Sequence, residues 1–362
     1  MKIAVLIDTW FPAVGGGQIN AWEISSRLAQ NGQIIEIITR NCGVDNYKGS
    51  KYLTIRKLGR LSKPTDDIAR LKYLFESLIY LIKNDFDVVL AHAFLPGLVA
   101  KIFMIIKGKP AIFIVHGTSI DTNLLKGFKA WLEKFISTQI KYSAQITVSR
   151  DFLKVKNVND KIEYIPNGIN PIFFKQPVEL KKRVKKQLLF VGRLHPQKNL
   201  INLIEAIKIL KTESFPVELL IVGDGPQKRQ IKELIKKYNL EDFVKLEGPK
   251  TPSQLINYYL ASTAFILPSI YEGQALTLLE AWACKLPVIV SKTGDNTYLV
   301  KEGKNGYFIQ NQDDPISISK AIKKALNNNE LGKIGQNGFL DVKNYFSWDY
   351  SAQQIIKLLK NL

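Results

Sequence analysis

The chain contains 362 residues, of which 46% are apolar, and its 51 basic and 32 acidic side chains give a net charge of +19. These values exclude a disordered chain and predict a folded protein of about two ordinary domains. The most apolar stretch, residues 94–106, contains Pro96 and Lys101 and is too short to span a bilayer. Only Cys42 and Cys284 are present, which excludes a disulfide framework and favours a reducing cytoplasm.

The positive charge suits three classes of partner: nucleic acid, an anionic membrane surface or a phosphorylated substrate. Its lysines are spread over many predicted helices, and neither an arginine-rich stripe nor an aromatic–basic RNA signature occurs. We therefore expect no nucleic acid partner. A solvated lysine-rich surface remains the plain alternative. The first ten residues are too short for the apolar region of a secretion signal, so they are interpreted as a strand of the mature protein.

Strands and helices alternate through the first half of the chain. Apolar runs predict strands buried on both faces of a parallel sheet, at residues 2–7, 34–39, 87–91, 111–115 and 145–149, with a weaker strand at 52–56. Apolar residues at helical spacing predict helices at residues 18–31, 71–82, 95–107 and 126–142. This alternation indicates a doubly wound α/β domain.

A second alternating series follows a break in the pattern. Residues 162–175 are rich in proline and asparagine, and a lysine cluster at 181–186 follows, so the linker is placed there. Strands are expected at 188–192, 217–223, 244–248, 264–268 and 305–309, and helices at 199–212, 226–238, 252–261 and 348–362. The sequence thus predicts two Rossmann-like domains facing a cleft, residues 1–170 and 171–345, with ligands beyond the carboxyl ends of the strands.

The segment Pro268–Ser291 predicts a loop, a helix and a buried strand in close succession. Glu272 lies in the loop and Glu280 in the helix, so the helix amino terminus falls between them. The free N–H groups and positive dipole end at this terminus suit a diphosphate. A helix of about eight residues spans roughly 12 Å, which is about the distance from a ribose to the far sugar of a nucleotide-sugar.

Ordinary surface glutamates are the alternative for both positions. Glu280, however, lies between Leu279 and Ala281 in an otherwise apolar helix, whereas a solvated helix face should carry more than one charge. The functional interpretation is therefore favoured for this segment.

Two further loops follow predicted strands. Gly15, Gly16 and Gly17 precede the first helix, and consecutive glycines let backbone N–H groups approach a phosphate closely. A flexible glycine loop is an equally good alternative. In the second domain, VGRLHPQKN places Arg193 and Lys198 between a strand and a helix. Two cations beside a helix amino terminus suit a diphosphate, and solvated loop cations are the alternative.

One histidine, His116, follows the strand at 111–115. A lone histidine in this place is more often a structural hydrogen-bonding residue than a catalytic one, and His92 and His195 are expected equally near the cleft. No two histidines or carboxylates have metal-ligand spacing, so no metal is expected.

Together these motifs resemble those of the family-4 retaining glycosyltransferases, which have the GT-B fold. The resemblance covers nearly the whole chain, and it rests on the glycine loop, HG at His116, IPNGIN, VGRLHPQKN, LLIVGDGP, PSIYEG with the following EA, NGYFI and FSWDYSA. Two departures stand out: Cys284-Lys285 where relatives have glycine, and SKTGD at 291–295 where relatives have S-x-x-G-G. The second departure lies near the expected donor side of the cleft.

The resemblance implies transfer of a hexose-type sugar from a UDP- or GDP-sugar to a hydroxyl of a glycan or lipid-linked acceptor. It implies that the anomeric configuration is retained and that neither a metal nor another cofactor takes part. The first domain would bind the acceptor and the second the donor, and the final helix, residues 346–362, would cross back to the first domain.

The resemblance also implies roles for individual residues. Arg193 and Lys198 would clamp the diphosphate, and Glu280 would bind the ribose. The donor sugar would contact Glu272, His116 and the segment Gly273, Gln274, Ala275 and Leu276, while Gly16 and Gly17 would lie against the donor. His116, Arg193, Lys198 and Glu272 would form the catalytic group. Since no residue requires a covalent intermediate, we expect same-face attack, with the two cations stabilising charge on the departing phosphate.

Two other functions stay open: a nucleotide-sugar epimerase of GT-B-like fold and a non-catalytic nucleotide-sugar binding protein. The predicted helix at 126–142 alternates Phe128, Trp131, Leu132, Phe135 and Ile136 with lysines, a pattern typical of helices that lie on anionic membranes. Such contact would suit a lipid-linked acceptor and envelope polysaccharide or glycolipid synthesis at the inner face of the membrane. A helix simply packed on the sheet is the alternative.

Overall fold

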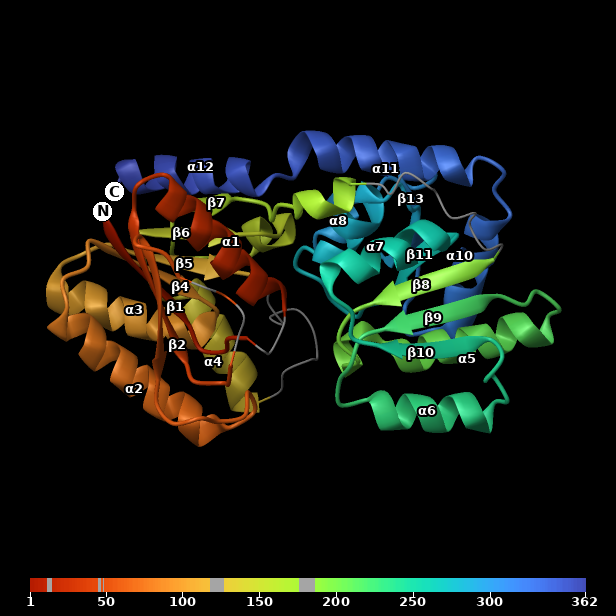
Figure 1. Cartoon of the computed structure of the whole chain (residues 1–362), viewed down its shortest axis with the longest axis horizontal. Coiled ribbons are helices and arrows are strands. Elements are labelled where there is room, and N and C mark those ends of the chain that lie inside the picture. Colours follow the sequence, from red (N-terminus) through yellow and green to blue (C-terminus); the bar gives the residue numbers. More distant parts are fainter. Residues whose placement is uncertain (12–14, 45–46, 48, 118–126, 176–185) are drawn as a thin grey trace. The chain divides into compact units, whose positions relative to one another are not determined.

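The computed structural model describes residues 1–11, 15–44, 47, 49–117, 127–175 and 186–362. These residues form two compact units (Figure 1), Met1–Gly168 together with Trp348–Leu362, and Ile169–Ser347. Among them, no helix is both long and apolar enough to cross a membrane. Residues 181–185 of the expected linker lie outside the described residues, and Ile169–Lys175, just before it, belongs to the second unit.

The first unit is built on a seven-stranded parallel sheet with the order β3-β2-β1-β4-β5-β6-β7. Its strands are β1 Lys2–Ile7, β2 Ile34–Arg40, β3 Leu53–Leu58, β4 Val88–His92, β5 Ala111–Val115, β6 Ala144–Thr147 and β7 Ile162–Tyr164. Lys2 lies opposite Ile34 of β2, and Ile3 lies opposite Val88 of β4. The chain order reverses between β1 and β4, so the loops after these two strands diverge and leave a crevice.

The helices of the first unit pack on both faces of this sheet. They are α1 Gly16–Gln30, α2 Asp67–Lys83, α3 Phe94–Lys107, α4 Gly127–Thr138 and α12 Trp348–Lys360, with a 3₁₀ turn at Arg150–Lys154. Right-handed crossovers place α1 on one face and α3 on the other; α12 contacts α1, whereas α2 and α4 contact α3 (Figure 1). The hydroxyl of Ser351 in α12 donates to the carbonyl of Pro166 at 2.6 Å. The prediction that the final helix returns to the first domain is confirmed.

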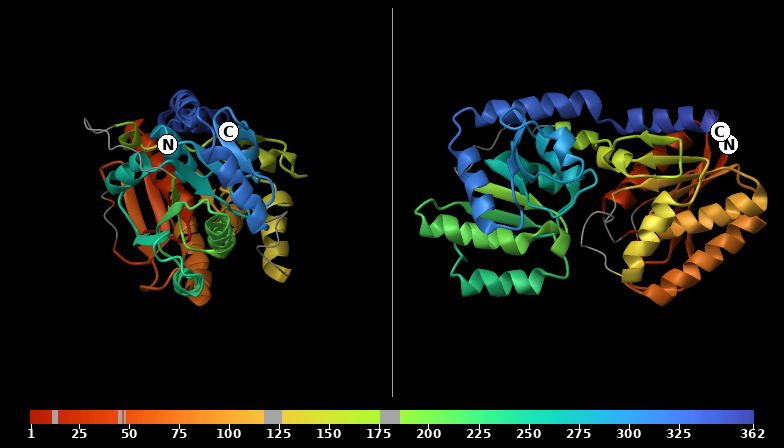
Figure 2. Two further views of the ribbon diagram at one scale, coloured as in Figure 1. Left: turned by 90° about the vertical axis from the view of Figure 1, so that its right-hand side faces the viewer. Right: turned by 180° about the vertical axis from the view of Figure 1, so that it is seen from behind.

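The second unit contains a six-stranded parallel sheet with the order β10-β9-β8-β11-β12-β13, seen from behind in the right-hand view of Figure 2. Its strands are β8 Gln187–Val191, β9 Glu218–Val222, β10 Val244–Gly248, β11 Ala264–Leu267, β12 Val288–Ser291 and β13 Gly306–Ile309. Its helices are α5 Leu200–Thr212, α6 Lys228–Lys237, α7 Pro252–Ala261, α8 Leu276–Ala283, α9 Asn296–Leu299, α10 Pro315–Leu326 and α11 Leu331–Tyr345, with 3₁₀ turns at Pro171–Phe174 and Pro196–Lys198. The order reverses between β8 and β11.

The predicted pair of doubly wound parallel sheets is confirmed, with two local differences. Strand β7 falls inside the stretch that the sequence assigns to the break between domains. It has only three residues, all half-buried at the sheet edge, so it carries no buried apolar run to reveal it. Helix α4 ends at Thr138, earlier than the predicted residue 142, and residue 126 lies outside the described residues.

Candidate active site

The candidate donor site lies where strands β8 and β11 of the second unit end. Parallel strands bring their carboxyl ends to one edge, and the crevice opens at the reversal of strand order, here between β8 and β11. Arg193 and Lys198 follow β8, and Glu272 follows β11. The fold therefore brings together the two cations and the loop glutamate that the sequence separates by more than seventy positions.

Lys198 and Glu272 form a direct ion pair. The Lys198 ammonium lies 2.5 Å from Oε1 of Glu272, and the two side chains are only 19% and 7% exposed. Their loops are joined a second time, because the Gln197 side chain donates to the carbonyl of Tyr271 and the Ile270 amide donates to the carbonyl of Gln197, each at 2.9 Å. Lys198, which is expected to bind the diphosphate, and Glu272, which is expected to bind the sugar, are thus paired directly with each other.

Arg193 is exposed, on a turn that glycines hold in place. Gly223 has φ +141°, and a Cβ there would lie 1.9 Å from the carbonyl oxygen of Gly192. The Leu194 amide donates to the carbonyl of Asp224 at 2.9 Å. The GDGP motif therefore has a structural role at this edge, since its glycine lets the turn after β9 pack against the turn that presents Arg193.

The loop that carries Glu272 is supported by the turn after β12. Gly294 has φ +52°, and a Cβ there would lie 1.6 Å from the carbonyl oxygen of Glu272. The buried Asp295 donates its amide to the carbonyl of Gly273 at 3.1 Å and accepts from the Gln274 side chain at 3.1 Å. Although SKTGD departs from S-x-x-G-G, it keeps the glycine at position 294, where the nearby carbonyl of Glu272 leaves no room for a side chain. The sequence marks Asp295 only as a departure, with no signal for its contact with Gln274.

Helix α8 begins at Leu276, between the two glutamates as predicted. Ala275 precedes it without a side-chain cap and accepts from the amides of Leu278 and Leu279, which leaves the amides of Leu276 and Thr277 without an intrahelical acceptor. Farther along, Oε2 of Glu280 accepts from the hydroxyl of the buried Tyr259 at 2.7 Å. Burial raises the pKa of Glu280 to about 7, and the Tyr259 hydrogen bond opposes the rise. Tyr259 comes from α7, and the apolar pattern of that helix gives no signal for this contact.

The carboxyl end of α8 explains the other departure. Lys285 has φ +56°, a left-handed conformation that favours glycine. Its amide donates to the carbonyl of Trp282 and the Leu286 amide donates to that of Ala281, each at 2.9 Å, which is the hydrogen-bond pattern of a Schellman cap. The helix therefore ends in a cap that favours glycine at position 285, and here a lysine adopts the strained left-handed conformation.

The first unit assembles a smaller cluster at its own strand ends. His92 ends β4, His116 follows β5, and their Nδ1 and Nε2 atoms lie 2.8 Å apart with the rings stacked. Burial lowers the pKa of His116 to about 4 and the pKa of His92 well below its usual value, so both rings are neutral at pH 7. A Cβ on Gly17 would lie 3.4 Å from the His116 ring. Gly16 and Gly17 are the first two residues of α1, which thus begins beside the pair of histidines.

Two residues near these motifs have structural explanations. His195 accepts from the Gln197 amide at its Nδ1 atom, which caps the 3₁₀ turn. Asn199 precedes α5 and is a residue type that commonly caps a helix with its side chain, but it does not do so here. The residue adopts φ +57° and makes no side-chain cap bond, and the Nδ2 group of its side chain donates instead to the carbonyl of Gln312 at 2.6 Å. Among the described residues, no three histidine, cysteine or acidic side chains are placed to hold a metal ion.

Comparison with known proteins agrees with this geometry. Residues 14–172 match the model of Glycosyltransferase Family 4, and residues 172–341 match the model of Glycosyl transferases group 1. The UDP-Gal:alpha-D-GlcNAc-diphosphoundecaprenol alpha-1,3-galactosyltransferase of Escherichia coli is 30% identical over 76% of this chain and 77% of its own. The chain belongs to glycosyltransferase family 4.

Solved structures similar to this glycosyltransferase have the same fold. Sucrose-phosphate synthase from Thermosynechococcus elongatus matches with a TM-score of 0.87 and 23% identity, over 99% of this chain and 98% of its own. HepE of Anabaena, in complex with UDP-glucose, matches with a TM-score of 0.80 and 18% identity over the full length of both chains. The GT-B fold is thereby confirmed.

In this glycosyltransferase the predicted site residues form two sets. The second unit brings together Arg193, Lys198, Glu272, Glu280 and the start of α8. The first unit brings together Gly16, Gly17 and His116.

Proposed function

We propose that this glycosyltransferase moves a hexose from a UDP- or GDP-sugar to a hydroxyl of a glycan or lipid-linked acceptor, with retention of configuration and without a metal. The observation that carries the proposal is the junction of β8 and β11. It presents a paired lysine and glutamate, an exposed arginine and an uncapped helix amino terminus at one strand edge.

This junction offers separate groups for each part of a nucleotide-sugar. Arg193 supplies an exposed charge, and the amides of Leu276 and Thr277 at the start of α8 supply N–H donors, both of which suit a diphosphate. The Glu280 carboxylate has one oxygen bonded to Tyr259, and in the proposal its other oxygen accepts from a ribose hydroxyl. Glu272 and the backbone from Gly273 to Leu276 bind the sugar.

The ion pair implies an exchange of partners during binding. Lys198 is paired with Glu272, and in the proposal an entering diphosphate competes for its ammonium group. As Lys198 turns to the phosphate, Glu272 is released to accept hydrogen bonds from the sugar hydroxyls. Arg193 and Lys198 then stabilise the charge that grows on the leaving phosphate, while that phosphate accepts the proton of the attacking hydroxyl on the same face.

The relatives support the choice of substrates. The Escherichia coli relative is named for a UDP-galactose donor and a diphosphoundecaprenol-linked acceptor, and the HepE structure contains UDP-glucose. We propose a similar lipid-linked acceptor for this enzyme, bound by the first unit, with His116 contacting the donor sugar. The enzyme would then act in the cytoplasm, at the inner face of the membrane, in envelope polysaccharide or glycolipid synthesis.

A radiolabelled donor assay tests the proposal. Membrane lipid extract supplies the acceptor, chelator is present throughout, and NMR of the product reports its anomeric configuration. We expect label in the lipid fraction with the configuration of the donor retained. Epimerised free donor would instead indicate an epimerase, and donor binding without chemistry would indicate a binding protein. Glu272→Gln should lose transfer, whereas Glu241→Gln, an exposed glutamate on the same unit, should keep it.

A further inference from the structure

Helix α2 presents an apolar stripe to solvent. Its buried side consists of Tyr73, Ser77 and Leu81. The opposite side carries four large exposed residues at helical spacing, namely Ile68, Leu71, Phe75 and Ile79, of which Ile68 is 78% exposed. The burial of such side chains is worth about 1.5–3 kcal/mol each, so a row of them left in water indicates a surface that another phase or molecule covers.

Helix α4 presents a second stripe, made of aromatic rings. Phe128, Trp131 and Phe135 stack in succession with centroid distances of 5.6 and 5.4 Å, and the Trp131 side chain is 57% exposed. Ile136 is buried against the rest of the unit, so α4 packs with one side and leaves the rings outside. Exposed tryptophan and phenylalanine beside lysines are typical of helices in the membrane interface.

The two stripes approach each other at their amino-terminal ends. Lys129 of α4 and Asp67 of α2 form an ion pair of 3.5 Å, which joins the amino-terminal ends of the two helices. Together the stripes form one surface, called here the α2–α4 surface: Ile68, Leu71, Phe75 and Ile79 with Phe128, Trp131 and Phe135. Exposed lysines accompany it on both helices, at Lys72, Lys129 and Lys134.

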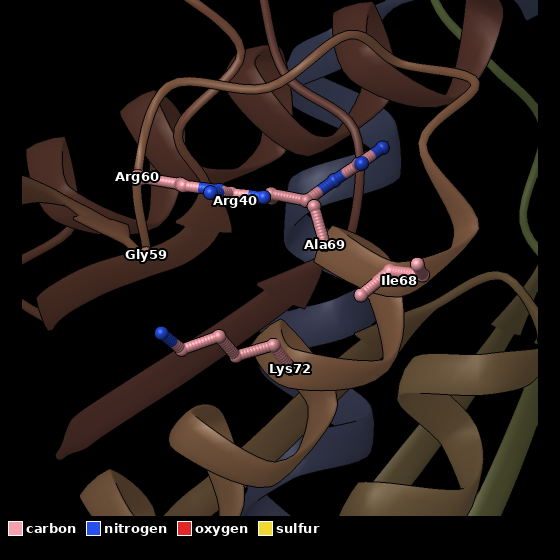
Figure 3. A pocket seen from close by; sticks show the side chains of 6 residues that line it. All are labelled: Arg40, Gly59, Arg60, Ile68, Ala69 and Lys72. Atoms are coloured by element: carbon pink, nitrogen blue, oxygen red, sulfur yellow. The ribbon is translucent and has the colours of Figure 1, made fainter.

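A basic cavity of about 280 Å³ adjoins this surface. Its lining consists of Arg40, Gly59, Arg60, Ile68, Ala69 and Lys72 (Figure 3). Figure 3 shows the Lys72 side chain extending from α2 toward the turn with Gly59 and Arg60. Ile68 belongs to both the cavity and the apolar stripe, so a molecule whose charged end enters the cavity would have its apolar end beside the stripe.

The charges of this cavity favour an anion. The Arg40 guanidinium donates only to backbone carbonyls, those of Asp8, Lys63, Pro64 and Asp66, so these bonds hold it in place without neutralising its charge. Lys72 has one carboxylate within reach, that of Glu76 at 3.7 Å. The lining of the cavity thus contains three cationic residues and no acidic one.

We propose that the α2–α4 surface docks on an anionic membrane and that the adjoining cavity binds the phosphate of an acidic phospholipid headgroup. This inference deepens the proposed peripheral association of the enzyme and rests on it. The aromatic and aliphatic side chains of the α2–α4 surface enter the membrane interface. Lys72 reaches the headgroup from α2, and Arg60 reaches it from the turn before α2. A second copy of the chain suits the surface less well, because facing copies would bring like-charged lysine rows together.

Vesicle sedimentation without donor or acceptor tests this proposal. The probes are vesicles of phosphatidylglycerol with phosphatidylcholine, and of phosphatidylcholine alone. Wild type should bind the anionic vesicles, with affinity falling as salt rises. Since each cation near such a surface contributes about a fivefold gain in binding, Arg60→Ala with Lys72→Ala should weaken binding more than tenfold. Lys232→Ala with Lys236→Ala, which removes equal charge from α6 of the second unit, should change it less than about twofold.

Three further results decide between the surface, the cavity and self-association. Trp131→Ser with Phe75→Ser should also weaken binding more than tenfold, whereas Ile316→Ser, which replaces another exposed apolar residue on α10, should not. Lys129→Ala with Lys134→Ala should weaken binding as well, because these lysines lie on the docking surface, but by less than the cavity pair, which also loses its direct contacts with the headgroup phosphate. Equal losses for the two pairs would show that the headgroup site is wrong. If the wild-type protein does not sediment with anionic vesicles, or if it forms dimers through Phe75 and Trp131 instead, the membrane proposal is wrong. Donor binding, measured separately, would leave the proposed transferase activity standing in either case.

Discussion

Replacing Glu280 by glutamine should stabilise the ligand-free protein at alkaline pH and leave it unchanged in acid. Burial raises the pKa of this carboxyl from 4.5 to about 7. The folded protein therefore holds the proton more tightly than the unfolded chain does. This contribution to stability is fully present below pH 4.5 and is lost as the pH rises through about 7.

The size of the effect follows from the same pKa. By pH 8 the ionised carboxylate destabilises the folded state by at most about 3 kcal/mol relative to the protonated form. Glutamine has no charge to desolvate, and its side-chain oxygen still accepts from Tyr259. Glu280→Gln should thus raise the free energy of unfolding by about 1–3 kcal/mol at pH 8, with little change near pH 4.5.

Urea unfolding from pH 4.5 to 8 measures this difference, with Glu241→Gln as the solvent-exposed control. A gain of the same size at every pH would refute the reasoning, and so would a loss at pH 8. The binding of a nucleoside diphosphate gives a second readout. Because ribose hydroxyls stabilise the ionised carboxylate, binding near pH 6.5 should release protons from wild type and not from Glu280→Gln. Calorimetry in buffers of different ionisation enthalpy detects that release.

Lys198→Ala and Arg193→Ala should each weaken diphosphate binding by about 1.5–3 kcal/mol, as titration calorimetry measures. Only Lys198→Ala should also lower the free energy of unfolding, by about 1–3 kcal/mol, because it leaves the buried carboxylate of Glu272 without its partner. Equal stability of the two variants would contradict the ion pair. Gly338→Ala should destabilise the protein by about 1–3 kcal/mol, since its Cβ would lie 2.2 Å from Trp282. Gly332→Ala on the same helix has open space and should stabilise it by about 0.4–1 kcal/mol; chemical unfolding of both variants compares them, and losses of equal size would contradict this packing.

The sequence predicts the sheets and the donor loops because buried strands and strand-to-helix turns leave local patterns. Lys2–Ile7 and Ala111–Val115 coincide with their apolar runs, and the amino terminus of α8 falls between the two glutamates as expected. Pairings between distant segments leave no such pattern. Neither the Lys198–Glu272 ion pair nor the partner of Glu280 on α7 is visible in the spacing of residues.

The local sequence pattern also does not predict which side of a helix faces water when both sides carry apolar residues. The periodicity of the helix at 71–82 includes Leu71, Leu74, Phe75, Leu78 and Ile82. The structure leaves Leu71 and Phe75 exposed and buries Tyr73, because the hydroxyl of Tyr73 reaches the carbonyl of Ile38 in β2 at 2.9 Å. The apolar stripe of α2 therefore emerges only once the sheet is in place.

Titration calorimetry on the two glutamate variants tests the proposed donor site most directly. A nucleoside diphosphate and the intact nucleotide-sugar are titrated into wild type, Glu280→Gln and Glu272→Gln. Glu280→Gln should weaken both ligands by similar factors, since the ribose is common to them. Glu272→Gln should leave the diphosphate bound at least as tightly as in wild type, because Lys198 is freed, while the intact donor loses affinity. If Glu272→Gln weakens the bare diphosphate as much as Glu280→Gln does, the segment from Glu272 to Glu280 does not lie along the donor.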